Sequence, residues 1–596
     1  MSLQTNFLLD YLTVNTAYES QTIPNKNQVT FLSKKTGIPQ LWTWTETSGQ
    51  IKQVMDFPDR VVSVHHSPTG KYTIVGMDHK GNEKQQLYLV KDALNQVEEL
   101  VISPDYFHLF GAWSPDERKI AWSSNRRHPG YFDIYVQNLE TKEYEVVYEY
   151  NGNCTPIKWL YNSTKLLISV QETNIDNALY LLDIETKKLQ RIGSQDKTGR
   201  FHSVQLTKDG AGGFLLSDVN DNTKALYSFT FENNEMKKVL HIPKWDIDEM
   251  KLSPDEQKLV YTVNEGGISS IHILDLKSNK SMQVKDILNG KLDSLSWLND
   301  DEFIFTLKSP IQPGDIWRYT LSANTVVRIT YFSKSEKIEA QLIEPELHSF
   351  TSFDGLEVPY FYYAKEKKKQ PAMIYVHGGP ESQISAEYHP TIQYLASQGF
   401  AVIAPNIRGS MGYGRNYVKL DDVRKRMDAI ADIASLVRHL TEHNLIDPEK
   451  VGIMGRSYGG FVVLAAITHY PDLWSAAVDI VGISHFKTFL ENTGPWRRKL
   501  RECEYGSLEH DTEFFEEIAP LNLTDRIKTP LLVFHGKNDT RVPISEAEQL
   551  VNNLKSRGNE VEFIIFEDEG HFTEKLENHI TLNSTTVEFM KKHLTY

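Results

Sequence analysis

Residues 451–470, VGIMGRSYGGFVVLAAITHY, hold the pattern that decides the fold of the second half of the chain. They begin with an apolar, strand-like run and end with an apolar run of helical length, joined by the turn Gly455-Arg456-Ser457-Tyr458-Gly459. A serine on so tight a turn is strained and needs small neighbours. Glycines at 455, 459 and 460 meet that need. The segment therefore predicts a serine hydroxyl held above a sheet at the start of a helix.

Apolar runs alternate with helical patterns on both sides of this segment. Before it, from about Leu342 onward, come PAMIYV (371–376) and FAVIAP (400–405). After it come AAVDIVG (476–482), PLLVFHG (530–536) and EVEFIIF (560–566). Strands that are apolar on both faces and alternate with helices are typical of a doubly wound, mostly parallel sheet.

Two polar side chains follow later strands of this predicted sheet. Asp539 comes after PLLVFHG and His571 after EVEFIIF, at the strand ends where open α/β sheets bind ligands. A serine nucleophile needs a base that is itself oriented by an acid, and the chain order Ser, Asp, His is that of the α/β-hydrolase fold. We therefore predict Ser457 as nucleophile, His571 as base and Asp539 as acid. Asp568 lies too close to His571 in sequence to orient it.

Backbone donors for an oxyanion are expected at two places. The Tyr458 N–H lies at the predicted helix N-terminus, and His377-Gly378-Gly379-Pro380 follows the strand AMIYV, where this fold places a second donor. We predict Gly379 as that donor, with a plain Gly-Pro turn as the alternative. The glycine-rich segment 408–414 lacks the lysine of a P-loop and is interpreted as a shaped loop near the site. No metal-ligand motif is found, so we expect no metal and no cofactor.

The first 340 residues contain a repeat. An aliphatic residue followed by an aromatic ring recurs seven times, at second positions separated by 46, 47, 45, 47, 45 and 45 residues. The pairs are Leu41-Trp42, Leu87-Tyr88, Ile134-Tyr135, Leu179-Tyr180, Leu226-Tyr227, Ile271-His272 and Ile316-Trp317. Each pair lies in one hairpin pattern, and a second turn-and-strand pattern such as WSPDERKIAWSS precedes most of them. Four strands per unit at this period predict a seven-bladed β-propeller.

Composition limits the remaining possibilities. A chain of 596 residues implies two or more domains, and we place an N-terminal arm at 1–20, the propeller at 21–340 and the α/β-hydrolase domain at 341–596. The net charge of −15 argues against nucleic acid or an anionic membrane as partner. Two cysteines, Cys154 and Cys503, exclude a disulfide framework. Since no signal peptide or long apolar run is found, we expect a cytoplasmic protein.

Five motifs carry a resemblance to a known family: HGGP (377–380), NIRGSMGYG (406–414), GRSYGG (455–460), HGKNDTRVP (535–543) and DEGHF (568–572). In this order, after a propeller, they resemble the prolyl oligopeptidase family of serine peptidases over essentially the whole chain. HGGP and the short segment before the first blade are most similar to the acylaminoacyl-peptidase branch. The resemblance implies a propeller that covers the active site and admits short peptides, whose N-terminal residues, acylated or free, are released.

The family's motifs also imply residue roles. Ser457, Asp539 and His571 match its triad, and Tyr458 and Gly379 its oxyanion donors. Its primary specificity pocket follows the serine turn, where Val481, Phe486 and Phe489 are candidates for substrate binding or plain core residues. The resemblance further implies a homo-oligomer.

Other functions stay open at this point. Dipeptidyl peptidases of the wider family hold a free amine with paired propeller glutamates, and no such segment is found here. That reading is therefore disfavoured but not excluded. An esterase with the same triad and a non-enzymatic propeller scaffold are the remaining alternatives.

Overall fold

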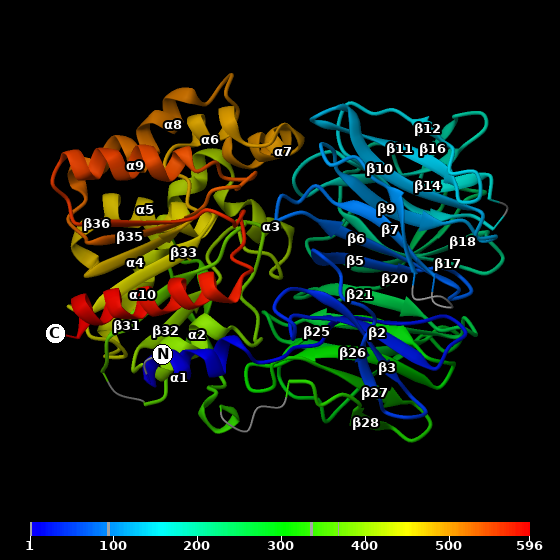
Figure 1. Ribbon diagram of the computed structural model, residues 1–596, viewed down its shortest axis with the longest axis horizontal. Helices are drawn as coiled ribbons and strands as arrows, with labels where there is room; N and C mark the ends of the chain where they lie inside the picture. The colour runs from blue at the N-terminus through cyan, green and yellow to red at the C-terminus, as the bar shows by residue number, and fades with distance from the viewer. Residues whose placement is uncertain (1–2, 92–95, 162, 334–337, 367–368, 596) are drawn as a thin grey trace.

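The computed structural model describes residues 3–91, 96–161, 163–333, 338–366 and 369–595. Two domains lie side by side in it (Figure 1). The first half of the chain forms an all-β domain, and the second half forms an α/β domain on which both termini lie. Within the described ranges, every helix is too short or too polar to span a lipid bilayer.

Seven four-stranded antiparallel sheets, each made of four consecutive strands, form the all-β domain. Each aliphatic–aromatic pair of the sequence repeat lies in the third strand of its sheet, so the predicted seven-bladed propeller is confirmed. The strands are, blade by blade, β1 (Tyr18–Thr22), β2 (Gln28–Ser33), β3 (Gln40–Thr45), β4 (Ile51–Gln53); β5 (Arg60–His66), β6 (Tyr72–Asp78), β7 (Gln86–Lys91), β8 (Gln96–Val101); β9 (His108–Trp113), β10 (Lys119–His128), β11 (Tyr131–Asn138), β12 (Tyr144–Tyr148); β13 (Cys154–Trp159), β14 (Lys165–Gln171), β15 (Asn177–Asp183), β16 (Leu189–Arg191); β17 (Phe201–Leu206), β18 (Gly212–Ser217), β19 (Ala225–Thr230), β20 (Met236–Leu240); β21 (Asp246–Leu252), β22 (Lys258–Asn264), β23 (Ser269–Asp275), β24 (Lys280–Gln283); β25 (Lys291–Trp297), β26 (Glu302–Lys308), β27 (Asp315–Thr320) and β28 (Thr325–Arg328).

The turns between first and second strands follow from the Ser-Pro-Asp sequences. In blade three the Ser114 hydroxyl donates to Asp116 Oδ1 over 2.6 Å, and the same oxygen accepts the Arg118 N–H at 3.2 Å. Ser253 and Asp255 repeat the first contact in blade six, also at 2.6 Å. Such side-chain hydrogen bonds replace a backbone turn, which is why Ser and Asp mark these positions.

The ring closes through side chains, because its first and last blades share no strand. Ser20 and Thr306 join their hydroxyls at 2.8 Å, and Thr22 and Ser296 at 2.7 Å. The first strand of the propeller begins at Tyr18, inside the segment that we expected to be part of an N-terminal arm.

An eight-stranded sheet forms the centre of the α/β domain, in the order β29-β30-β32-β31-β33-β34-β35-β36. The strands β31 to β36 run parallel, and β29 and β30 form an antiparallel hairpin at one edge, as expected of an α/β-hydrolase domain. These strands are β29 (Glu346–Thr351), β30 (Glu357–Tyr363), β31 (Ala372–Val376), β32 (Ala401–Pro405), β33 (Val451–Arg456), β34 (Ala476–Ile480), β35 (Leu531–Gly536) and β36 (Val561–Phe566).

Helices cover both faces of the sheet (Figure 1). Ile374 and Ile453 belong to the core beneath α4, α5 and α9, whereas their neighbours Met373 and Met454 belong to the core beneath α1, α2 and α10. The helices are α1 (Leu3–Leu12), α2 (Pro390–Ser397), α3 (Arg415–Val418), α4 (Arg426–Glu442), α5 (Tyr458–His469), α6 (Phe486–Asn492), α7 (Pro495–Tyr505), α8 (Thr512–Ile518), α9 (Ser545–Ser556) and α10 (Leu576–Leu594). Alternate strand residues thus bury opposite faces, which explains the continuously apolar strand sequences.

The N-terminal helix α1 packs on the α/β domain of its own chain. Tyr11 of α1 lies 5.8 Å from Tyr394 of α2, measured between ring centres, and its carbonyl oxygen accepts the Tyr388 hydroxyl at 2.7 Å. This helix therefore leads into the first blade of the propeller and packs on the face of the hydrolase sheet that α2 and α10 cover.

Candidate active site

Ser457 lies on the predicted turn between β33 and α5, with φ 60° and ψ −120°. Its N–H donates to the Ile480 carbonyl at 2.8 Å, which ties the turn to the neighbouring strand. A Cβ added to Gly455 would lie 2.4 Å from the Gly459 oxygen, and one added to Gly459 would lie 2.3 Å from the Val376 oxygen. The glycines are therefore required by close packing around the strained serine.

The structure brings the three predicted triad residues together. Ser457 Oγ lies 3.1 Å from His571 Nε2, and His571 Nδ1 lies 2.7 Å from Asp539 Oδ2. The other carboxylate oxygen of Asp539 accepts the N–H groups of Arg541 (2.8 Å) and Val542 (3.0 Å). Because a carboxylate accepts at Nδ1, the proton of a neutral imidazole resides there and Nε2 is left to accept the serine proton.

Electrostatics favour the neutral form of this histidine. Burial lowers the pKa of His571, and the charge of Asp539 opposes that shift only in part. Burial alone would raise the pKa of Asp539, but the charge of His571 and the hydrogen bond to it outweigh burial and lower the pKa. At neutral pH the pair is therefore an ionised carboxylate and an uncharged base.

The acid limb of the pH–rate profile is expected below pH 6.5. His571 must be neutral to accept a proton, and its pKa lies below the ordinary value of 6.5. We therefore expect kcat/KM to stay level as the pH is lowered from 7, and to fall only when the pH passes the lowered pKa of His571. The measurement is kcat/KM against pH for an uncharged substrate. A midpoint at or above 6.5 would contradict the assignment.

The two predicted oxyanion donors lie in segments next to the serine. The Tyr458 N–H opens α5, and Gly378 lies beside the nucleophile, since a Cβ added to Gly378 would be 3.4 Å from Ser457 Cβ. Gly379 adopts φ 127°, and its carbonyl oxygen accepts the Tyr505 hydroxyl at 3.2 Å. Both glycines line the space above Ser457, so the role of Gly379 as oxyanion donor stays a prediction.

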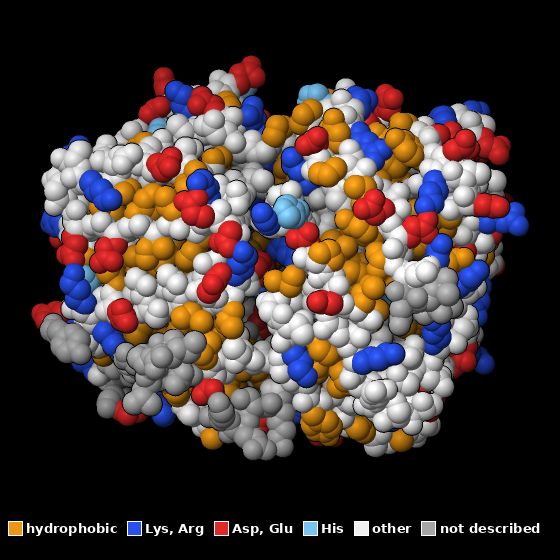
Figure 2. All heavy atoms as spheres, viewed as in Figure 1, with side chains coloured by type: hydrophobic (Ala, Val, Ile, Leu, Met, Phe, Trp, Pro, Cys, Tyr) orange, Lys and Arg blue, Asp and Glu red, His pale blue; other side chains and the backbone are white. Residues whose placement is uncertain are grey.

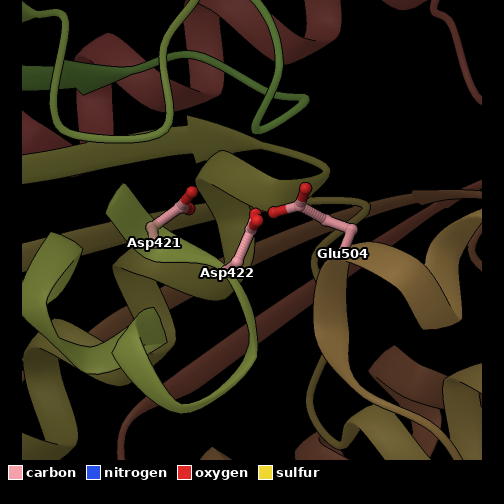
Figure 3. A group of neighbouring side chains, drawn as sticks. All are labelled: Asp421, Asp422 and Glu504. Carbon is pink, nitrogen blue, oxygen red and sulfur yellow. The ribbon is translucent and has the colours of Figure 1, made fainter. Parts of the chain in front are cut away.

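Three carboxylates form a cluster (Figure 3), and one of them accepts a hydrogen bond from the Tyr458 hydroxyl. The facing oxygens of Asp421, Asp422 and Glu504 lie within 4.8 Å of one another, and those of Asp422 and Glu504 point toward each other. Arg426 forms ion pairs with Asp421 and Glu504, and burial raises the pKa of Asp421 to about 7. Arg426 thus supplies the positive charge that a metal ion would supply, and bound protons can reduce the remaining negative charge.

This cluster supports the oxyanion side of the site. The Tyr458 hydroxyl donates to Asp421 Oδ2 at 2.9 Å and lies 3.0 Å from Arg426 Nη1. From the propeller, the Asn174 amide donates to Glu504 at 2.7 Å. We therefore assign the cluster to holding Tyr458 and the domain interface in place rather than to metal binding.

The three predicted specificity residues are buried in the core. Phe486 and Phe489 pack on Tyr505 with ring centres 4.6 and 5.9 Å away, and Val481 donates its N–H to the Phe534 carbonyl. They do not belong to the lining of the cavity above Ser457. Their role in substrate binding stays a prediction, and the structure gives them a packing role.

A cavity of about 380 Å³, called here the active-site cavity, opens above the triad. Ser457, His571, Gly378 and Arg497 are among its lining residues. A second cavity of about 610 Å³, called here the interdomain cavity, lies between the propeller and the α/β domain. Its lining includes Tyr18, Glu19, Phe107 and Glu83 of the propeller and Trp496 of the α/β domain.

Arg541 and Phe572 line both cavities. Arg541 pairs with Glu83 of the propeller over 2.7 Å, and its guanidinium lies 5.1 Å from the ring centre of Phe572. Figure 2 shows charged side chains gathered along the seam where the two domains meet. The ion pair thus joins the domains at the junction of the two cavities.

Sequence reasoning missed several of these residues. Arg541 follows Asp539 by two positions and Phe572 follows His571 directly, so adjacency to the triad was an available signal. Arg456, next to Ser457, donates to the His571 carbonyl at 2.8 Å and so fixes the histidine loop. No sequence signal identifies Glu83, because its partner lies in another domain.

The geometry defines a class of protein: an α/β hydrolase of the serine type, covered by a seven-bladed propeller. Residues 386–596 match the model of the prolyl oligopeptidase family, and residues 89–312 match that of the TolB beta propeller domain. The match to the prolyl oligopeptidase family thus covers most of the α/β domain.

The proteins to which this chain is similar are named for different peptidase activities. Dipeptidyl aminopeptidase BIII of Pseudoxanthomonas mexicana is 28% identical over 412 residues, which are 65% of this chain and 59% of that protein. Acylamino-acid-releasing enzyme of Arabidopsis thaliana is 30% identical over 36% of this chain and 30% of its own length. The structure of the Pyrococcus horikoshii acylaminoacyl peptidase has the same fold, with a TM-score of 0.76, 19% identity and coverage of 98% of this chain and 97% of that one. The chain thus spans less than two thirds of the length of both sequence relatives.

Proposed function

We propose that the protein is a serine peptidase that releases N-acylated amino acids from short peptides. The charged lining of the active-site cavity carries this proposal. Among the described residues of that lining, the arginines are Arg456, Arg497 and Arg541, and the carboxylate is that of Glu387. An excess of positive charge repels a free ammonium group on the substrate, whereas an acylated amino end is neutral.

The triad geometry supports acyl transfer in two steps. Ser457 Oγ attacks the scissile carbonyl carbon while His571 takes its proton, and the oxyanion forms beside the Tyr458 N–H. His571 then gives the proton to the leaving amine, which leaves an ester on Ser457. A water molecule, deprotonated by the same histidine, attacks that ester, and His571 returns the proton to Ser457 Oγ as the acylated amino acid leaves.

Short substrates are supported by the arrangement of the domains. The propeller covers the α/β domain on the side of the triad, and the Glu83–Arg541 pair bridges them at 2.7 Å. A folded protein does not fit cavities of about 380 and 610 Å³, whereas a peptide of a few residues does.

A dipeptidyl or aminopeptidase is the second candidate. Three propeller carboxylates, those of Glu19, Asp78 and Glu83, line the adjoining interdomain cavity, and their negative charge favours a free amine there. A relative named as a dipeptidyl aminopeptidase supports the same alternative.

Three matched p-nitroanilides distinguish these functions: N-acetylalanyl, alanyl and alanylalanyl. We expect the acetylated substrate to be cleaved with a kcat/KM at least about tenfold higher, the scale of one repulsive charge contact avoided. Preference for the alanyl or alanylalanyl anilide would move the function to the second candidate. Cleavage of p-nitrophenyl esters without any anilide cleavage would make the protein an esterase.

We further propose a cytoplasmic location and assembly as a homo-oligomer. Both cysteines are free thiols, Cys154 buried and Cys503 exposed, which supports a reducing compartment. The oligomer rests on the family resemblance, and light scattering that gives a 68.4 kDa particle would contradict it.

A further inference from the structure

Arg497 carries an unpaired charge into the active-site cavity. It lies in the first turn of α7 and lines the same cavity as Ser457 and His571. Its Nη1 atom is buried and has no hydrogen-bond acceptor among the described residues. No carboxylate of those residues forms an ion pair with it, and its guanidinium lies 5.6 Å from the ring centre of Trp496.

Neighbouring arginines differ from Arg497 because each has a defined acceptor. Those contacts are Arg541 with Glu83 at 2.7 Å, Arg501 with Glu381 at 3.0 Å, and Arg456 with the His571 carbonyl at 2.8 Å. A buried guanidinium nitrogen without an acceptor, such as Nη1 of the half-buried Arg497, is costly, and such atoms are normally paired. Because Arg497 lines a cavity that also holds the nucleophile, we infer that a ligand supplies the acceptor.

The charge of Arg497 is present at neutral pH. Burial, together with the nearby Arg501 and Arg541, lowers the pKa of Arg497 to about 10, which is still well above 7. A carboxylate matches the planar guanidinium with two parallel hydrogen bonds, and in a buried site this is the strongest pairing that arginine makes.

We propose that Arg497 binds a carboxylate of the substrate, so that preferred substrates are short peptides with a carboxylate close to the scissile bond. This inference rests on the proposed peptidase function and narrows it. Because Arg497 and Ser457 line one cavity of about 380 Å³, the carboxylate must belong to a residue near the scissile bond. It is either the free C-terminus of a very short peptide or an acidic side chain.

Binding to a Ser457→Ala variant tests this without turnover. Isothermal calorimetry compares N-acetyl-Ala-Ala as free acid with its C-terminal amide, and N-acetyl-Asp-Ala-amide with N-acetyl-Asn-Ala-amide. In at least one pair we expect the acid to bind about 10 to 100 times more tightly, the range of a charge-assisted hydrogen bond. Adding Arg497→Gln should remove that difference. Adding Arg498→Gln should keep it, because Arg498 donates to the Glu491 carbonyl on the exposed side of α7.

The pair that shows the preference identifies the source of the carboxylate. Equal binding within both pairs, or a preference that survives Arg497→Gln, would overturn the proposal. If Arg497→Gln does not fold, Arg497→Lys replaces it, because lysine keeps the charge but cannot make two parallel hydrogen bonds to a carboxylate. The preference for the acid should then fall severalfold, and an unchanged preference would contradict the proposal. Failure of the peptidase function would appear separately, as absence of anilide cleavage by the unmodified protein.

Discussion

Replacing Ser457 with alanine is expected to lower kcat by about a millionfold, the loss seen when the nucleophile of such a triad is removed. Ser457 Oγ is the atom 3.1 Å from His571 Nε2, and alanine leaves the histidine with nothing to deprotonate. Folding should not change, because alanine keeps the Cβ and the backbone that the glycine turn already accommodates. Residual hydrolysis would come from the oxyanion donors and binding alone.

Steady-state rates on the best anilide measure this loss, with thermal unfolding as the check on structure. The matched control is Ser556→Ala, which removes an exposed hydroxyl at the C-terminal end of α9 and should leave kcat within a factor of about two. A Ser457→Ala protein that keeps one hundredth of the activity would remove this serine from the mechanism.

The fold could be predicted from sequence because each domain has a regular sequence pattern. In the propeller an aliphatic–aromatic pair recurs every 45–47 residues, and in the α/β domain apolar strands alternate with helices. An aliphatic–aromatic pair lies in the third strand of every blade, and in the pair Leu87-Tyr88 the two side chains pack in different hydrophobic clusters. The propeller boundary was less predictable. β1 begins at Tyr18, three residues before the predicted start of the propeller. The sequence YESQT is a single short strand with no aliphatic–aromatic pair, so the repeat does not reveal it.

The triad could be predicted because each member lies within five residues of the end of a parallel strand. Ser457, Asp539 and His571 follow β33, β35 and β36, and parallel strands end at one edge of the sheet. Chain order and strand ends are both readable from sequence, so the proximity of the three side chains needs no further information.

Contacts across the two domains were not predictable in this way. Glu83 meets Arg541 only because the propeller is docked on the α/β domain, and no period in the sequence encodes docking. Phe486 and Phe489 show a second limit of the sequence. Apolar residues after the serine turn can line a substrate pocket or belong to the core, and residue type does not distinguish the two. Tertiary packing, not residue type, places them beneath Tyr505.

The asymmetry of the Asp539 carboxylate makes one substitution especially informative. Its Oδ1 accepts two backbone N–H groups, from Arg541 and Val542, while its Oδ2 accepts the His571 Nδ1 proton. An asparagine at this position must present its oxygen to the backbone donors. Its amide NH2 therefore faces His571 Nδ1, which can then only accept.

Asp539→Asn is accordingly expected to lower kcat by about 10⁴ with little change in KM, because the neutral imidazole is forced to carry its proton on Nε2 and cannot accept that of Ser457. Single-turnover rates on the acetylated anilide measure the effect, since acylation is the step that needs the correct tautomer. Asp568→Asn is the matched control, because Asp568 lies three positions before His571 but pairs with Lys575 at the surface. We expect this variant to keep kcat within a factor of about three of the unmodified protein. Equal losses in the two variants, or an Asp539→Asn protein within tenfold of the unmodified rate, would show that the acid of the triad has been misassigned.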